Sequence, residues 1–246
     1  MKKLSALALL GLGPTIAIQL LFGGPRLAVG QVDQETARGL ELFVAGCSSC
    51  HGVMGQGTDQ GPPLIGVGAA AVDFMLSTGR MPLANPDEQP VRHPPKYSGD
   101  EIRAIVAYVS SLAPGGPDIP IVVPGQGDLA QGHEIYSANC LACHGAAAQG
   151  ASVGGGAVAP SLEAATPTQL AEAARIGPGV MPLFREDFIS EAEMNSLVRY
   201  ILWLRNAPDR GGLGLGHVGP VLEGLVGWLI GLGLLVLVIR ATGTRT

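Results

Sequence analysis

The chain has 246 residues and a formal net charge of −5. Hydrophobic residues make up 47% of it, but aromatic residues only 4%, and 37 residues are glycine. Large side chains are therefore too few to build the cores of two domains unaided, and the modest negative charge without a basic run gives no basis for nucleic-acid binding.

The N-terminus has the pattern of an export signal. Two lysines precede an apolar stretch that ends at Phe22, and the small residues Ala28 and Gly30 follow, as they do at signal-peptidase sites. Residues 1–30 are therefore predicted to be a signal peptide. Because the apolar stretch is long for a cleaved signal, an uncleaved N-terminal anchor is the alternative.

One sequence unit occurs twice after this segment, and it predicts two domains over residues 31–113 and 129–207. Each copy holds a helix with a glycine and an aromatic residue four positions later, a C-x-x-C-H motif, a proline turn, a Met-Pro pair and a serine-capped amphipathic helix. The matched segments are 39–52 with 132–145, 61–64 with 159–162, 77–82 with 177–182, and 98–112 with 190–204. Both copies are expected to be mainly helical.

Two segments rich in proline or glycine separate these domains from each other and from the C-terminus. Residues 114–128 contain repeated prolines, which predict a stiff, extended linker. Residues 208–220 are rich in glycine and predict a hinge.

An apolar segment at the C-terminus predicts a transmembrane helix over residues 221–240. Its length reaches the roughly 20 residues that cross a bilayer at 1.5 Å per residue. Arg240 and Arg245 follow it, which places the C-terminus in the cytoplasm by the positive-inside rule. A buried hairpin of a soluble core is the alternative, although nothing else in the chain is large enough to bury it.

All four cysteines belong to the two C-x-x-C-H motifs, and three chemistries compete for them: Cys47, Cys50, Cys140 and Cys143. A redox disulfide needs no following histidine and normally occurs in a βαβ setting. A zinc site would join both pairs, yet they begin at positions 47 and 140, far beyond the usual separation of about 15–20 residues. Covalent haem attachment uses both thiols and the histidine. A bound macrocycle would also supply the core that the composition lacks.

The axial ligands of each haem are predicted to be a histidine and a methionine. His51 and His144 belong to the motifs, and Met81 and Met181 stand at matching places before a proline. Met54 is too close to His51 to reach the opposite haem face. The remaining candidates are expected to pack in helices, to lie on the surface, or to lie in the hinge: Met75 and Met194, His93 and His133, and His217.

Further residues are expected to act around these ligands. The carbonyls of Pro62 and Pro160 are expected to accept the Nδ1–H of the motif histidines, with a simple turn as the alternative. Three interpretations of Arg80 stay open: it pairs with a haem propionate, it contacts an acidic partner protein, or it is a solvated surface charge.

His/Met ligation closes both axial positions and raises the reduction potential, so the expected chemistry is outer-sphere transfer of single electrons. A dihaem peroxidase is the competing enzyme reading. It would require one open iron face, and therefore a Met81 or Met181 that does not ligate.

The order C-x-x-C-H, G-P-x-L and M-P between two helices resembles class I cytochrome c, twice over. The predicted fold is therefore mainly α, with two tandem class I cytochrome c domains and a C-terminal transmembrane helix. The segments "GPPLIGVGAAAVDFMLSTGRMP" (61–82) and "GGLGLGHVGPVLEGLVGWLIG" (211–231) further resemble the dihaem cytochrome c subunit of the actinobacterial-type cytochrome bcc complex. This similarity extends from about residue 35 to residue 240.

The resemblance implies the electron-transfer subunit of quinol:cytochrome c reductase, with no catalytic site of its own. It implies a cytochrome b subunit as a partner, a Rieske iron–sulfur subunit as electron donor and a terminal cytochrome c oxidase as acceptor. It also implies two covalently bound haem c groups, on the extracytoplasmic side of the plasma membrane. The ligands that it implies are Cys47, Cys50, His51 and Met81 for the first haem, and Cys140, Cys143, His144 and Met181 for the second.

A stand-alone anchored dihaem carrier between a dehydrogenase and an oxidase is the alternative to a complex subunit. A mobile carrier would need a longer tether than residues 207–220 provide. The tether therefore favours a fixed subunit.

Overall fold

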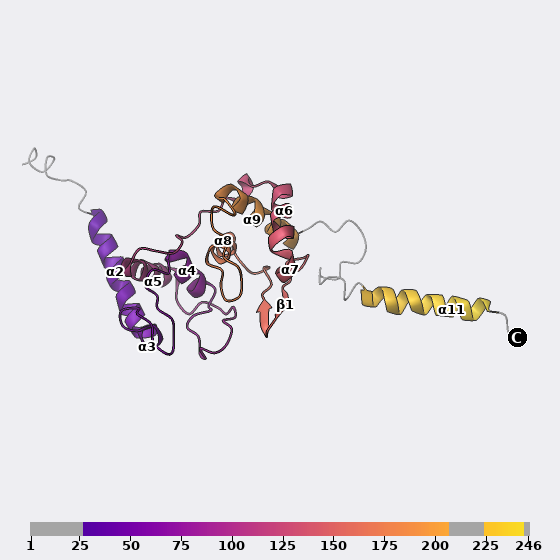
Figure 1. Ribbon diagram of the computed structural model, residues 1–246, viewed down its shortest axis with the longest axis horizontal. Helices are drawn as coiled ribbons and strands as arrows, with labels where there is room; N and C mark the ends of the chain where they lie inside the picture. Colours follow the sequence, from indigo (N-terminus) through magenta and orange to yellow (C-terminus); the bar gives the residue numbers. More distant parts are fainter. Residues whose placement is uncertain (1–26, 207–223, 244–246) are drawn as a thin grey trace, which may run out of the picture. The chain divides into compact units, whose positions relative to one another are not determined.

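The computed structural model describes residues 27–206 and 224–243, and the described chain is predominantly α-helical, as predicted (Figure 1). Contacts within the polypeptide divide it into two compact units. The first comprises the described residues up to Ile65 together with Tyr97–Ala113, and the second comprises Gly66–Lys96 and the described residues from Pro114 onward. Most of the predicted signal segment and the whole predicted hinge lie outside the described residues.

The first unit is built on two helices in contact, α2 (Leu27–Gly46) and α5 (Gly99–Leu112), with the one-turn α3 (Ser48–His51) after α2. Ser98 begins α5 with a capping box, in which its hydroxyl accepts the backbone N–H of Glu101 and the Glu101 carboxylate accepts that of Ser98. The predicted serine-capped amphipathic helix is confirmed here.

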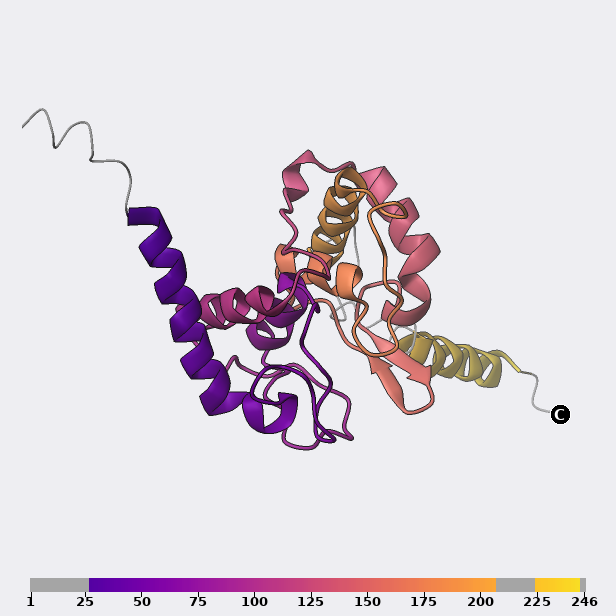
Figure 2. The same cartoon turned by 60° about the vertical axis from the view of Figure 1, so that its left-hand side comes forward.

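The second unit repeats this pair with α6 and α9, which lie against each other (Figure 2). Its core gathers apolar side chains from α6, α8 and α9 around Tyr136, which is fully buried. The elements of this unit are α4 (Ala69–Ser77), η1 (Pro124–Gln126), α6 (Leu129–Asn139), α7 (Leu141–His144), β1 (Ala151–Gly154), β2 (Ala157–Ala159), α8 (Pro167–Ile176) and α9 (Glu191–Arg205).

A glycine lets the two long helices of each unit approach closely. A Cβ added at Gly39 would lie 2.8 Å from the Cβ of Tyr108 on α5 and would overlap a backbone carbonyl of that helix. At Gly132, the added Cβ would lie 2.8 Å from the Cβ of Tyr200 on α9 and would also overlap a carbonyl. The two copies therefore use the same helix crossing, and each needs a residue without a side chain at that point.

The predicted linker is bound to its surroundings in its second half. The backbone N–H of Val123 donates to Oδ1 of Asn195 at 2.8 Å, and that of Asp128 donates to Oγ of Ser196 at 2.9 Å. Asn195 and Ser196 both belong to α9. The segment therefore packs as part of the second unit.

A short β-hairpin was not predicted. Strands β1 and β2 pair antiparallel, with an irregularity between Ser152 and Gly154, and Gly155 and Gly156 in the turn both have positive φ. Each strand is only three or four residues long. Such strands are too short to show period-2 alternation in the sequence.

The C-terminal helix confirms the predicted apolar span. Residues 224–242 form a helix of 19 residues that is long and apolar enough to cross a membrane. It contains a π-helical stretch, η2 (Gly227–Leu232), followed by α11 (Gly233–Thr242). Its large apolar side chains are exposed, as a lipid-facing helix requires.

Replacing Gly132 tests the helix crossing. Gly132→Ala places a methyl group against Tyr200 and a backbone carbonyl of α9, so we expect a loss of about 1–3 kcal/mol in the free energy of unfolding. Gly125→Ala is the matched control, because its Cβ would meet nothing within 4 Å. Chemical denaturation of the full-length chain measures both, and equal losses in the two variants would contradict this account of the crossing.

Candidate haem-attachment sites

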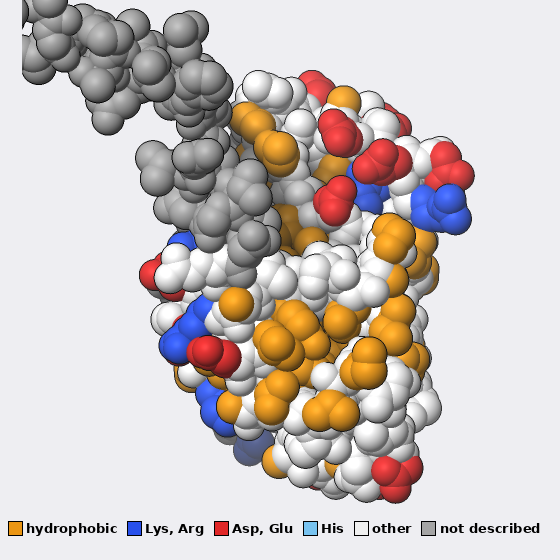
Figure 3. Space-filling view, turned by 90° about the vertical axis from the view of Figure 1, so that its left-hand side faces the viewer, with side chains coloured by type: hydrophobic (Ala, Val, Ile, Leu, Met, Phe, Trp, Pro, Cys, Tyr) orange, Lys and Arg blue, Asp and Glu red, His pale blue; other side chains and the backbone are white. Residues whose placement is uncertain are grey.

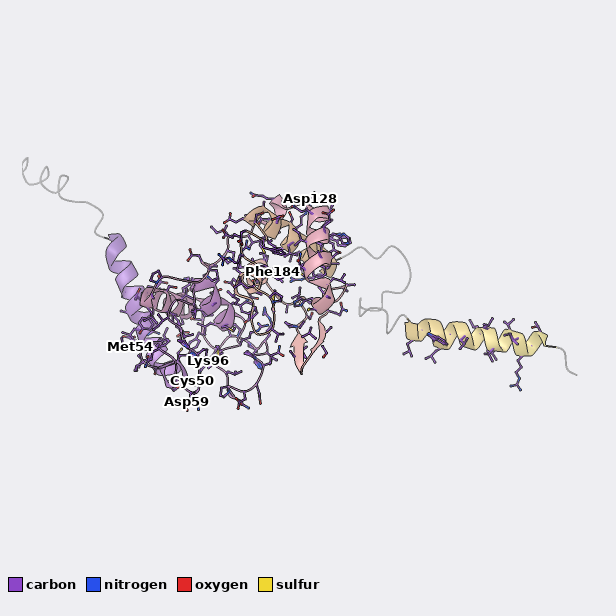
Figure 4. All side chains as sticks on the ribbon, in the orientation of Figure 1. Cys50, Met54, Asp59, Lys96, Asp128 and Phe184 are labelled. Carbon is purple, nitrogen blue, oxygen red and sulfur yellow. The ribbon has the colours of Figure 1, made fainter. Side chains whose placement is uncertain are left out.

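Both C-x-x-C-H motifs adopt the same one-turn helix. Cys47 and Cys140 begin these turns with φ and ψ of −123° and −31°, and of −117° and −34°. The backbone N–H of His51 donates to the Cys47 carbonyl at 2.9 Å, and that of His144 donates to the Cys140 carbonyl at 2.8 Å. Each turn therefore holds two thiols and one imidazole within five residues, and Figure 4 labels Cys50 of the first motif.

The loops that follow the two motifs also have matching backbone conformations and hydrogen bonds. Gly55 has φ of 70°, and Ala148 at the matching place has φ of 57°, a left-handed conformation that is rare for alanine. Leu64 donates its N–H to the Gly55 carbonyl at 2.7 Å, and Leu162 donates to the Ala148 carbonyl at 2.9 Å. The repeat therefore extends from the motif to the proline turn.

Each motif histidine is hydrogen-bonded to a proline carbonyl, as predicted. Nδ1 of His51 lies 2.8 Å from the Pro62 oxygen, and Nδ1 of His144 lies 3.0 Å from the Pro160 oxygen. A carbonyl can only accept, so Nδ1 must carry the hydrogen. The lone pair of Nε2 is then left for a metal ion, and the ring orientation is defined.

Burial makes the second site suitable for a neutral ligand set. Burial lowers the pKa of His144, and the hydrogen bond to Pro160 acts in the opposite direction. Burial, and then the charge of Cys143, raise the pKa of Cys140 to about 11. A thiol with this pKa is a poor redox nucleophile, which argues against a redox disulfide. The donor set therefore fits haem c.

The predicted methionine ligands occupy corresponding places after α4 and α8. Met181 is partly buried and packs against the core of the second unit, which also holds the second motif. Met81 belongs to the second unit as well, whereas Cys47, Cys50 and His51 belong to the first. The second ligand set therefore belongs to one compact unit. The residues of the first ligand set are divided between the two units.

Other residues singled out in the sequence lie as follows. His93 and His133 are exposed, as expected, and Met194 is buried in the core, also as expected. The guanidinium of Arg80 lies 4.7 Å from the centre of the Phe74 ring, a cation–π contact that the sequence did not predict. His217 lies outside the described residues.

Apolar side chains are exposed near both motifs. Val53 and Met54, just after the first motif, are 61% and 71% exposed, and Leu141 in the second is 41% exposed. Figure 3 shows one face of the molecule on which apolar side chains gather with few charges among them. Exposed apolar side chains beside both motifs favour a surface that a bound group or a partner covers.

A segment after Met81 contacts the hairpin and α8. The side-chain amide of Gln89 donates to the Val158 carbonyl at 2.8 Å and accepts the Val158 N–H at 3.0 Å. Arg92 donates to Oε1 of Gln169, and Nε2 of Gln169 donates to Oγ of Ser77 at 3.1 Å. Sequence reasoning missed these residues, because their partners lie about 70–90 positions away.

These features define a c-type cytochrome: a repeated helical unit in which a C-x-x-C-H turn presents an oriented histidine. Comparison with known families agrees. A protein-family model described as "Cytochrome c" matches residues 36–113, and one described as "Cytochrome C oxidase, cbb3-type, subunit III" matches residues 127–201. Cytochrome c domains carry covalently bound haem c and transfer electrons.

Similar proteins show which family of c-type cytochromes the chain belongs to. The cytochrome bc1 complex cytochrome c subunit of Corynebacterium diphtheriae is 33% identical over 95% of this chain and 90% of its own. The protein of the same name from Mycobacterium bovis is 35% identical over 94% and 87%. A cbb3-type cytochrome c oxidase subunit CcoP from Azospirillum is 29% identical over 67% and 60%. The chain belongs to the family of cytochrome c subunits of the cytochrome bc1 complex.

Substitution of Gln89 tests its contact with the hairpin. Gln89→Ala removes both hydrogen bonds to Val158, worth about 1 kcal/mol each, so we expect the Val158 amide to exchange its hydrogen about fivefold faster or more. Gln89→Glu keeps an oxygen to accept the Val158 N–H and should preserve most of the protection. Hydrogen exchange of the full-length chain measures both, and unchanged protection in the alanine variant would contradict the contact.

Proposed function

We propose that this chain is the membrane-anchored dihaem electron-transfer subunit of a respiratory quinol:cytochrome c reductase. The observation that carries the proposal is the identical histidine–proline geometry at both motifs, at 2.8 and 3.0 Å, in a family whose members are named as subunits of the cytochrome bc1 complex. Two motifs with the same histidine–proline contact support two haems in one chain.

In this proposal each residue of the two ligand sets has one task. Cys47, Cys50, Cys140 and Cys143 would hold the macrocycles as thioethers, and His51 and His144 would bind the irons through Nε2. Met81 and Met181 would supply a second ligand to each iron. Bound haem c supplies one-electron chemistry between two oxidation states of iron. The protein orients the imidazoles and excludes water and small ligands from the irons.

The proposed partners follow from the family. A Rieske iron–sulfur protein would deliver single electrons, a cytochrome b subunit would share the complex, and a terminal cytochrome c oxidase would accept the electrons. The apolar helix at 224–242 supports membrane attachment, and Arg240 directly after its apolar run supports a cytoplasmic C-terminus with the haem units outside.

Purification of the full-length chain from membranes tests the complex. A C-terminally tagged chain in mild detergent should recover a cytochrome b and a Rieske protein, and quinol should reduce both haems. Recovery of the chain alone, with two low-spin haems that quinol does not reduce, would contradict the subunit assignment and support the stand-alone carrier.

Replacement of a methionine tests the axial ligand. Met181→Leu should convert the second haem from six-coordinate low-spin to high-spin and lower its reduction potential, since thioether ligation raises it. Met194→Leu is the matched control, because Met194 is a 2% exposed core residue outside the Met-Pro segment and leucine keeps its volume. Paramagnetic resonance and redox titration measure both. A low-spin second haem in Met181→Leu would contradict ligation by Met181.

A further inference from the structure

Helix α8 buries a carboxyl group without a hydrogen-bond partner. Glu172 is 0% exposed, and neither of its carboxyl oxygens accepts a hydrogen bond from any described residue. An isolated buried carboxylate is costly enough that such a group usually binds a proton instead. Burial, and after it the charge of Asp73, raise the pKa of Glu172 to about 9. Glu172 is not among the predicted haem ligands, so haem binding does not explain why it is buried.

The position of Glu172 is defined by the packing of α8 against α4. Asp73 and Ser77 share a face of α4, and Gln169 and Glu172 share a face of α8, since residues three or four apart are neighbours on a helix. One turn from the Asp73–Glu172 contact, Nε2 of Gln169 donates to Oγ of Ser77 at 3.1 Å. The two faces therefore interact at two places: Gln169 donates to Ser77, and the charge of the Asp73 carboxyl acts on the Glu172 carboxyl.

Two ionised carboxylates offer only acceptors and repel each other. A single proton between Asp73 and Glu172 removes this repulsion, because one carboxyl then donates to the other. Aspartic-protease dyads show the same sharing of one proton between two carboxyls. The contact between α4 and α8 is therefore stable with one proton bound and strained without it.

The positive groups around this contact are engaged with other partners. On α8, Arg175 donates to the carbonyls of Phe184 and Ile189 at 2.9 and 2.7 Å. The charged groups of α9, which packs against α8, are Glu191, Glu193, Arg199 and Arg205, and Arg80 and Arg92 follow α4. Arg92 donates to Gln169, Arg199 to the Gly127 carbonyl, Arg205 to the Leu162 carbonyl, and Arg80 lies over Phe74. None of these described groups donates to Glu172.

Helices α4 and α8 are the corresponding helices of the two copies, and each leads into a Met-Pro segment, at Met81 and at Met181. We propose that Asp73 and Glu172 form a proton-binding site between these helices, which takes up a proton when the adjacent haem unit is reduced and releases it on oxidation. The linkage to reduction rests on the proposed function, since it requires Met81 and Met181 to ligate.

Charge explains the direction of this linkage. One electron from an iron–sulfur donor makes the interior of the haem unit more negative. Charges inside a protein interact more strongly than charges in water. The carboxyl pair then binds one proton from water more tightly, and transfer of the electron to a metal-centre acceptor returns that proton to water. By reciprocity, if reduction tightens proton binding tenfold, protonation raises the reduction potential by about 59 mV.

Redox titration of both haems over a series of pH values tests the linkage in the full-length chain. Because the oxidised site already holds its proton below a pKa of about 9, we expect the midpoint potential of at least one haem in the wild type to fall as pH rises above about 9, by up to about 59 mV per pH unit. Glu172→Gln should abolish this slope. Glu134→Gln is the matched control, because it removes the same charge from an exposed place on α6, and it should keep the slope. The same slope in Glu172→Gln as in the wild type would overturn the linkage.

Two further measurements separate the possible failures. The redox-difference infrared spectrum should show a protonated carboxyl band that Glu172→Gln lacks, and its presence in that variant would overturn the assignment. Haem stoichiometry and spin state, recorded first, report on the proposed function itself. If Glu172→Gln does not fold, Asp73→Asn removes the other carboxyl at a half-buried position and should also abolish the slope.

Stability gives a test that needs no electron transfer. The folded-state pKa of Glu172, about 9, lies above its ordinary 4.5, so its contribution to stability is fully present below pH 4.5 and is lost as pH rises toward 9. The denaturation midpoint of the wild type should therefore fall over this interval relative to that of Glu172→Gln. Parallel curves for the two proteins would show that the site does not hold a proton.

Discussion

The hydrogen bond between each motif histidine and a proline carbonyl determines how each unit is built. Because Nδ1 donates to Pro62 or Pro160, the imidazole has one orientation and Nε2 is free for iron. The chain must therefore return from the motif to the proline within a loop of defined conformation. The partners are 11 residues apart in the first copy and 16 in the second, and the hairpin of β1 and β2 lies within the longer loop.

Segments that differ between the two copies contact each other. The segment between the Met-Pro pair and the last helix is longer in the first copy than in the second, and Gln89 in this segment binds Val158 of the hairpin that only the second copy contains. Helices α4 and α8, which correspond in the repeat, pack directly together. The hairpin of the second copy therefore stabilises the segment that follows Met81 in the first copy.

Sequence reasoning predicted the features that depend on local chemistry. The repeated C-x-x-C-H motif, the capped helices at Ser98 and Ser190 and the apolar span, predicted at 221–240 and observed at 224–242, each follow from residue types a few positions apart. The carbonyl partners of the histidines were also predicted, because the prolines recur at matching places in the repeat.

Features that depend on contacts between distant segments could not be predicted in this way. Glu172 stands in an ordinary amphipathic helix pattern, and its burial follows only from the packing of α4 on α8. The ties of the linker to Asn195 and Ser196 likewise join residues about 70 positions apart. A single sequence shows which side chains are polar, but not which of them another helix covers.

The mass and the resonance spectrum of the purified full-length chain test the central claim most directly, namely that each copy is a complete histidine–methionine haem unit. We predict a mass increase of two covalently bound haems and a ferric spectrum that contains only low-spin species. A single haem, or a high-spin ferric component of comparable intensity, would contradict it.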